Sequence, residues 1–182
     1  MSEHLFNVYL AVLLQDTAFN VQTAIGKASK LSNPKGGSAF QIDARIYSKL
    51  EMFAVFYDGG RGHKDTDISI AVDVRRRQAL CDSGIASAIL VHRHGMSGIA
   101  DSIGSSLYFE VVTAKRASIL SGVKGIVEKL TGETCWVPFS TIAQALTTSE
   151  EEWAGTPGRN LLSFSGVLER EIKALKREGY IL

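Results

Sequence analysis

Short apolar runs separated by stretches of helical periodicity limit most strongly what this chain can fold into. Asn7 to Gln15 is almost continuously apolar and Ser87 to Val91 is a second such run, a pattern typical of strands buried on both faces. Thr17 to Leu31 and Ala117 to Leu130 instead carry apolar residues near helical spacing. Strands that alternate with helices predict an α/β fold with a mainly parallel sheet covered on both faces.

Four further segments continue this alternation before the chain changes character. Strands are expected over Ile42 to Leu50, Met52 to Tyr57 and Leu107 to Val112, with a short helix over Met96 to Ile103. One core of this kind suits a chain of 182 residues that is 45% hydrophobic.

The C-terminal part reads as a small helical extension, because Gly132 interrupts the chain after the helix-periodic segment. We expect a short helix over Ser140 to Leu146, a polar loop over Thr147 to Asn160 and a helix over Phe164 to Gly179. The predicted division is therefore a main domain at 1–132 and a helical segment at 133–182. The end of the last helix resembles the close of a recognition helix in winged-helix domains, which makes this segment helix-turn-helix-like and a candidate DNA reader.

Composition narrows the classes of partner. Lys and Arg number 20 against 19 Asp and Glu, so nucleic-acid binding would have to use a local patch of positive charge. No apolar run is long enough for a membrane span, so no membrane partner is expected. Cys81 and Cys135 lie far apart without metal-type spacing, which favours reduced thiols in the cytoplasm.

The stretch from Lys64 to Asp73 is the first place to look for chemistry, since it sets Asp67 and Asp73 on a mostly apolar element. Carboxylates at the edge of a buried element are costly unless charge, hydrogen bonds or a metal compensates them. Alternating apolar residues here favour a strand, whereas Thr66 as N-cap would start a helix that runs on to Leu80. Periodicity alone favours the strand.

Other polar residues are expected at one edge of the sheet. Asp16 follows the first apolar run, and His92 to His94 follow Ser87 to Val91. Ligands of open parallel sheets bind beyond the carboxyl ends of the strands, where these residues would fall. The alternative for Asp16 is to cap the helix expected from Thr17, and the alternative for Asp73 is to pair with Arg76 or Arg77.

Three segments together resemble the NYN branch of the PIN-like nuclease superfamily. Ala11 to Asn20 is similar to the family's first strand, which ends in an aspartate with an asparagine shortly after. Lys64 to Asp73 resembles its segment of Lys-Gly-x-Asp and an apolar run ending in Asp, and Ser87 to Val112 resembles its later strand, loop, helix and strand. The resemblance covers roughly Val8 to Leu130.

The resemblance implies a three-layer α/β/α sandwich in which Thr66 to Leu80 is helical, against its local pattern. It also implies a metal-dependent endoribonuclease, a phosphodiester hydrolase, in which Mg²⁺ or Mn²⁺ bound by oxygen ligands activates water. Asp16 and Asp67 would be the metal ligands. The catalytic candidates are Asp16, Asp67, Asp73 and His94, and the candidates for contact with RNA are Asn20, Lys64, Arg75, Arg76 and Arg93.

The chain departs from the family where the family carries Ser-Gly-Asp-x-Asp, because His92-Arg93-His94-Gly95-Met96 stands there. His94 and Met96 occupy the positions of the two aspartates, so the acidic site is incomplete. The alternative function is therefore a catalytically inactive PIN-like relative that serves as a nucleic-acid-binding or protein-interaction module. The C-terminal helices would then contact the partner, and a homodimer is left open.

Overall fold

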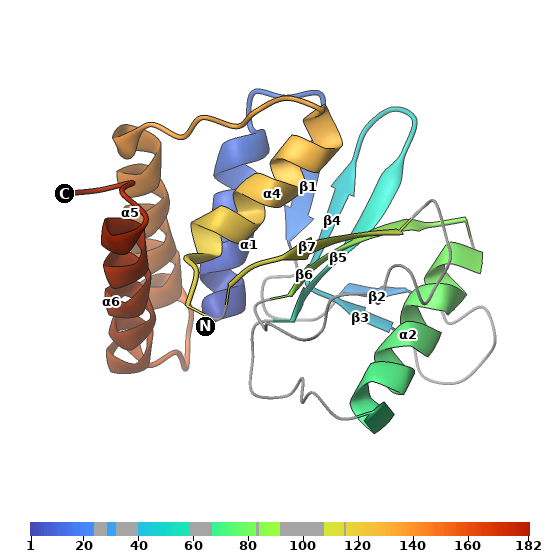
Figure 1. Cartoon of the computed structure of the whole chain (residues 1–182). Helices are drawn as coiled ribbons and strands as arrows, with labels where there is room; N and C mark the ends of the chain where they lie inside the picture. The colour runs from blue at the N-terminus through green and yellow to red at the C-terminus, as the bar shows by residue number, and fades with distance from the viewer. Residues whose placement is uncertain (24–28, 32–39, 59–66, 83, 92–107, 115) are drawn as a thin grey trace.

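The computed structural model describes residues 1–23, 29–31, 40–58, 67–82, 84–91, 108–114 and 116–182 (Figure 1). Its elements in chain order are α1 (Ser2–Leu14), β1 (Asn20–Thr23), β2 (Ser29–Leu31), β3 (Phe40–Ile42), β4 (Ala44–Tyr47), β5 (Met52–Asp58), α2 (Asp67–Asp82), β6 (Ala86–Val91), β7 (Tyr108–Val112), α4 (Ile119–Thr131), α5 (Phe139–Gly155) and α6 (Leu161–Arg177).

A five-stranded mixed sheet in the order β1-β4-β5-β6-β7 forms the centre, and β2 and β3 make a separate two-stranded sheet. The predicted α/β class is confirmed. The sheet is mixed rather than mainly parallel, because β1, β4 and β5 pair antiparallel while β5, β6 and β7 pair parallel. A tight turn joins β4 to β5, in which the Ser48 hydroxyl accepts from the backbone N–H groups of Leu50 and Glu51. Such a turn forces antiparallel pairing, whereas the helical crossover through α2 allows the parallel pairing of β5 with β6.

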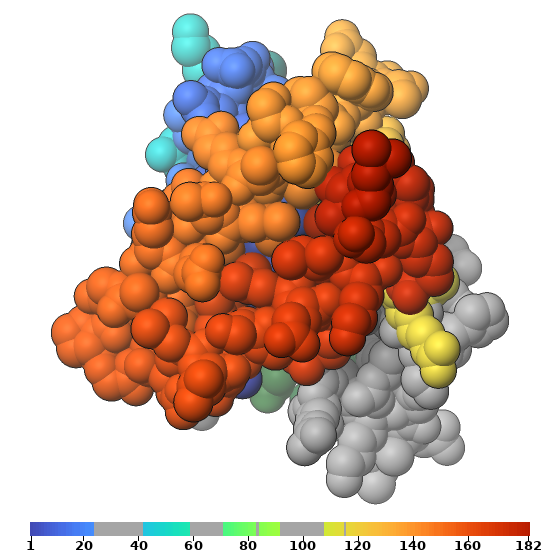
Figure 2. Space-filling view, turned by 90° about the vertical axis from the view of Figure 1, so that its left-hand side faces the viewer, coloured from blue at the N-terminus to red at the C-terminus, as the bar shows by residue number. Residues whose placement is uncertain are grey.

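Helices lie on both faces of this sheet (Figure 1). One face packs against α1 and α4, and α5 and α6 pack on α1 to extend the same apolar core. The other face is covered by α2, whose Ala79 and Leu80 pack with Phe56, Ile89 and Val91. On this side of the molecule, beyond α1, α5 and α6 form much of the surface (Figure 2). The division of domains at residue 132 remains a prediction.

The close approach of α4 to the sheet requires glycine. A Cβ atom at Gly122 would lie 2.3 Å from Cδ1 of Leu90, and one at Gly125 would lie 2.6 Å from Cγ1 of Val111. The backbone of α4 therefore packs directly against the side chains of Leu90 on β6 and Val111 on β7, and this contact sets the position of the first turn of α4.

The strand predicted over Asn7 to Gln15 is wrong, since Ser2–Leu14 is the helix α1. α1 lies between the sheet and the C-terminal helices, so nearly every side of it from Leu5 to Leu10 is buried. A helix buried all round loses its polar stripe and reads as a continuous apolar run, which periodicity cannot distinguish from a buried strand.

Two further predictions of secondary structure are wrong. The helix expected over Thr17 to Leu31 is replaced by β1 and β2, because Asn20–Thr23 pairs with β4 and tertiary pairing overrides a weak helical spacing. The polar loop expected over Thr147 to Asn160 is mostly helical, because α5 extends to Gly155 and buries Ser149 and Trp153.

The other predicted elements within the described residues are confirmed in type. Among them is α2, the helix that the resemblance selected against the local alternation of Ile68 to Val74. The strand expected over Ile42 to Leu50 is shorter, since β3 ends at Ile42 and β4 covers Ala44–Tyr47, and the helix expected over Ser140 to Leu146 is the first part of the longer α5. The short helix expected over Met96 to Ile103 lies outside the described residues. No helix in the described part of the chain is long and apolar enough to cross a membrane.

A buried cluster of charges joins α2 to the sheet. The Arg77 guanidinium donates to Oδ2 of Asp58 at 3.0 Å and to Oδ1 of Asp73 at 3.4 Å, and it lies 4.1 Å from the centroid of the Phe56 ring. All three charged side chains are buried. A guanidinium shared by two buried carboxylates offsets their cost of burial, so it fixes α2 relative to the end of β5.

Substitution Arg77→Met should lower the free energy of unfolding by about 3 kcal/mol, because it leaves two buried carboxylates without their guanidinium. The matched control is Arg76→Met, whose exposed position predicts a change within about 0.5 kcal/mol. Urea unfolding followed by circular dichroism measures both values. Equal stability of the two variants would contradict the structural role of this cluster.

Candidate functional site

The acidic residues expected to converge are separated by the sheet. Asp16 is exposed between α1 and β1, and β1 runs in the same direction as β5 because both pair antiparallel with β4. Asp16 and Asn20 therefore lie at the edge where β5 begins, whereas Asp58 ends β5 at the opposite edge.

α2 begins far from that first edge. Its last residue, Asp82, leads after a short connection into β6, and a helix of 16 residues is about 24 Å long. Asp67, the first residue of α2, thus lies toward the opposite edge of the sheet from Asp16, as the two helix ends in Figure 1 also show. The expected convergence of Asp16 with Asp67 is wrong, because it assumed that the segment before Asp16 was a parallel strand.

The remaining predicted residues are distributed as follows. Asp73 pairs with Arg77, which was the alternative interpretation of its charge. Arg75 and Arg76 are exposed on α2, where Nε of Arg75 donates to the Ala71 carbonyl at 3.1 Å. Within the described residues no group of three or more His, Cys, Asp and Glu is suited to a metal ion. Lys64, Arg93 and His94 lie outside the described residues.

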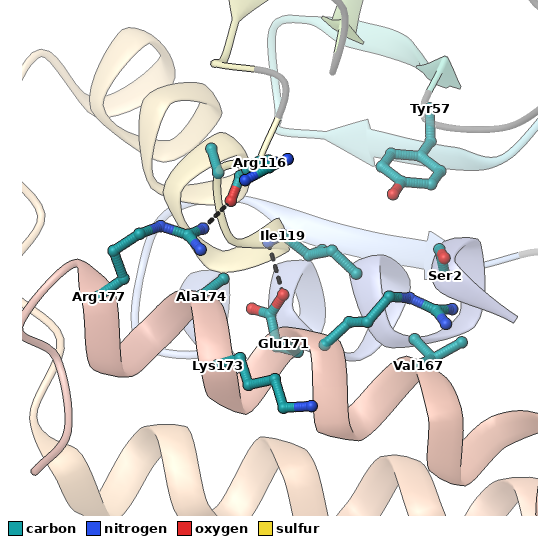
Figure 3. Close-up of a pocket in the computed structure, with 11 residues that line it drawn as sticks. Ser2, Tyr57, Arg116, Ile119, Val167, Glu171, Lys173, Ala174 and Arg177 are labelled. Atoms are coloured by element: carbon teal, nitrogen blue, oxygen red, sulfur yellow. Dashed lines mark hydrogen bonds between the residues drawn. The ribbon is translucent and has the colours of Figure 1, made fainter.

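A pocket of about 430 Å³ instead brings together residues from α1, β5, α6 and the turn before α4 (Figure 3). Its cationic side chains are Arg116, Arg170, Lys173 and Arg177, its hydroxyls are those of Ser2 and Tyr57, and its carboxylate is that of Glu171. The pocket lies on the face of the sheet covered by α1 and α4, and thus away from α2.

Helical spacing explains how α6 supplies most of this wall. Arg170, Lys173 and Arg177 are three and four residues apart, so they share one side of α6. Asn160 caps the first turn of α6 by accepting from the Leu162 N–H at 2.9 Å. At the other end the Arg177 guanidinium donates to the Arg116 carbonyl, which ties the turn before α4 to α6 (Figure 3).

Carboxylates of α6 and its C-cap already occupy the N-terminus of α4. Glu171 accepts from the N–H groups of Ile119 at 2.8 Å and Leu120 at 3.1 Å. Glu178 accepts from the Ser118 N–H at 2.7 Å and the Ser121 hydroxyl at 2.7 Å. The three backbone donors, on Ser118, Ile119 and Leu120, are amides that a helix leaves unpaired and that attract negative charge. The helix end is therefore internally satisfied, and an incoming ligand must use the side chains of the pocket.

The pKa of Glu171 is raised to about 7, chiefly by burial and also by the nearby charge of Glu178, against the two amide hydrogen bonds, which lower it. At neutral pH the only carboxyl group of the pocket thus carries part of a negative charge. None of the four pocket cations takes part in an ion pair within the part of the chain that the structure describes. The pocket is therefore strongly positive.

A second carboxyl group lies behind the Tyr57 wall. Oδ2 of Asp43 accepts from the Tyr57 backbone N–H at 2.6 Å, and the Tyr57 ring stacks on Phe6 at 4.9 Å between centroids. Burial raises the pKa of Asp43 to about 7, and the charges of Glu3 and Asp58 raise it as well, against the Tyr57 hydrogen bond. These contacts fix Tyr57, whose hydroxyl points toward the pocket (Figure 3).

The sequence carries one signal for this site, which is not among the candidate residues predicted from it. The spacing of Arg170, Lys173 and Arg177 places three cations on one side of the last helix. Arg116 had no comparable local signal, because only the packing of α4 brings it beside α6.

Replacing Glu171 with Gln should change how stability depends on pH. The unfolded side chain ionises near its ordinary pKa of 4.5, whereas the folded one keeps its proton to about pH 7. The folded state therefore binds more protons in this window, so the wild-type free energy of unfolding should fall between pH 4.5 and 7 relative to Glu171→Gln. Urea titrations of both proteins across this range measure the difference, and a difference independent of pH would contradict the assigned environment.

Comparison of this chain with family models, with curated proteins and with solved structures finds no match.

Proposed function

We propose that this chain is a nucleic-acid-binding module that binds single-stranded RNA through the basic pocket. The observation that carries the proposal is the set of four cations, Arg116, Arg170, Lys173 and Arg177, around a pocket of about 430 Å³. Three of the four are arginines, whose planar guanidinium groups bind phosphate oxygens in pairs.

The dimensions favour a flexible single strand over a duplex. The volume lies in the lower part of the range of about 300 to 1,000 Å³ that is typical of small-molecule sites. It therefore suits one nucleotide-sized group, which a single strand can turn out of its stack. Ser2 and Tyr57 add hydroxyl groups that can bond to sugar or phosphate oxygens.

This proposal corresponds to the inactive-relative hypothesis for the PIN-like resemblance. The helices on both faces of the mixed sheet are compatible with a three-layer α/β/α sandwich, which we propose for the core. Metal-dependent hydrolysis with Mg²⁺ or Mn²⁺ has less support, because Asp16 lies apart from α2 and Asp73 is paired with Arg77. Binding requires only the pocket cations.

Fluorescence anisotropy with labelled single-stranded RNA tests the proposal at about 0.05 M salt, where phosphate contacts are strong. The double variant Arg170→Gln/Lys173→Gln should weaken binding by about tenfold or more and reduce the slope of affinity against salt. The matched control, Arg75→Gln/Arg76→Gln, removes the same charge from the opposite face of the sheet and should bind as wild type. If the control variant alone loses affinity, RNA binds on α2 and the pocket is not the site.

Incubation of the RNA with Mn²⁺ and with chelator separates binding from hydrolysis. We expect the RNA to remain intact with Mn²⁺ and with chelator, for the wild type and for Asp67→Asn alike, because the predicted metal ligands do not converge. Cleavage that requires Mn²⁺ and disappears in Asp67→Asn would instead support the endoribonuclease hypothesis. Gel electrophoresis of the RNA gives the answer directly.

A further inference from the structure

The positive charge that lines the basic pocket exceeds the negative charge of one internal phosphate. A phosphodiester carries one negative charge, whereas a terminal phosphate carries about −1.5 to −2 at pH 7 and offers three oxygens as acceptors. Four cations face this volume, and the charge of Glu171 is spread over two amides of α4. A group with two charges balances such a pocket better than a group with one.

From this excess of positive charge, we infer that the basic pocket recognises the terminal phosphate of an RNA strand rather than its internal backbone. The inference rests on the proposed function and specifies its ligand. The arginines bond to the phosphate oxygens, Lys173 adds a point charge, and the Ser2 hydroxyl donates from the first turn of α1.

The test compares RNAs of one sequence and about ten nucleotides, a length within the usual range of single-strand sites. One carries a 5′-phosphate, one carries a 3′-phosphate and one has hydroxyls at both ends, each labelled internally. We expect one of the phosphorylated RNAs to bind about tenfold more tightly than the RNA with hydroxyl ends. Arg170→Gln should remove this difference, and Arg76→Gln, on the opposite face, should keep it.

The outcomes separate the two proposals. A preference for either phosphorylated end, lost in Arg170→Gln, supports the inference and identifies the end. Equal affinity for all three RNAs overturns the inference but leaves RNA binding in place, provided that Arg170→Gln/Lys173→Gln still weakens it. Absence of binding by all three RNAs overturns both proposals.

Discussion

The pocket depends on one interaction, the carboxyl group of Glu171 against the first amides of α4. This contact joins α6 to α4 across 52 residues of sequence. Burial of a carboxyl group is costly, and two N–H bonds together with the positive end of the helix offset that cost. Because Glu171 points inward, Arg170 on one side of it and Lys173 on the other stand at the rim of the pocket. The inward acid thereby orients the outward cations.

The opposite wall depends on the burial of α1. This helix packs against α4 and α5, so its first turn is held beside α6 and brings Ser2 to the pocket. Phe6 of α1 stacks on Tyr57, and Asp43 fixes the Tyr57 backbone from the start of β4. The apolar core and the polar wall are therefore built by the same residues, and disturbance of α1 would change both.

Much of the fold followed from local pattern, and the most consequential failure, the prediction of α1 as a strand, has a clear physical cause. β5, β6, β7 and α4 were predicted correctly. Each is either a short strand that reads as an apolar run or a helix with one buried face, whose apolar residues recur at helical spacing. α1 was predicted as a strand because a helix between two layers has no polar face. The same error explains why Asp16 does not lie where it was expected. Asp16 would lie at the carboxyl edge of the sheet only if the segment before it were a parallel strand, and that segment is the helix α1.

The site itself was less predictable than the fold, because its charges come from segments that only tertiary packing brings together. Arg77 illustrates the contrast: its pairing with Asp73 is a contact between residues four apart, so the sequence could suggest it. Its bond to Asp58 crosses from α2 to β5, and no local pattern marks it. Arg116 and Arg177 belong to this second kind, since they meet only when α6 docks against the start of α4.

The net charge of the chain was also a poor guide to binding, because charges in salt solution interact only over short distances. The chain has 20 basic and 19 acidic side chains, and this near-zero net charge predicts no general attraction for polyanions. Charges in water at physiological salt interact over only about 8 Å, so an anion in the pocket responds to the side chains around it and hardly to acids elsewhere. The fold sorts the charges: Glu171 and Glu178 are engaged by the N-terminus of α4, and Asp58 and Asp73 are engaged by Arg77. With those acids committed to structure, the pocket cations remain the groups that an anionic ligand meets.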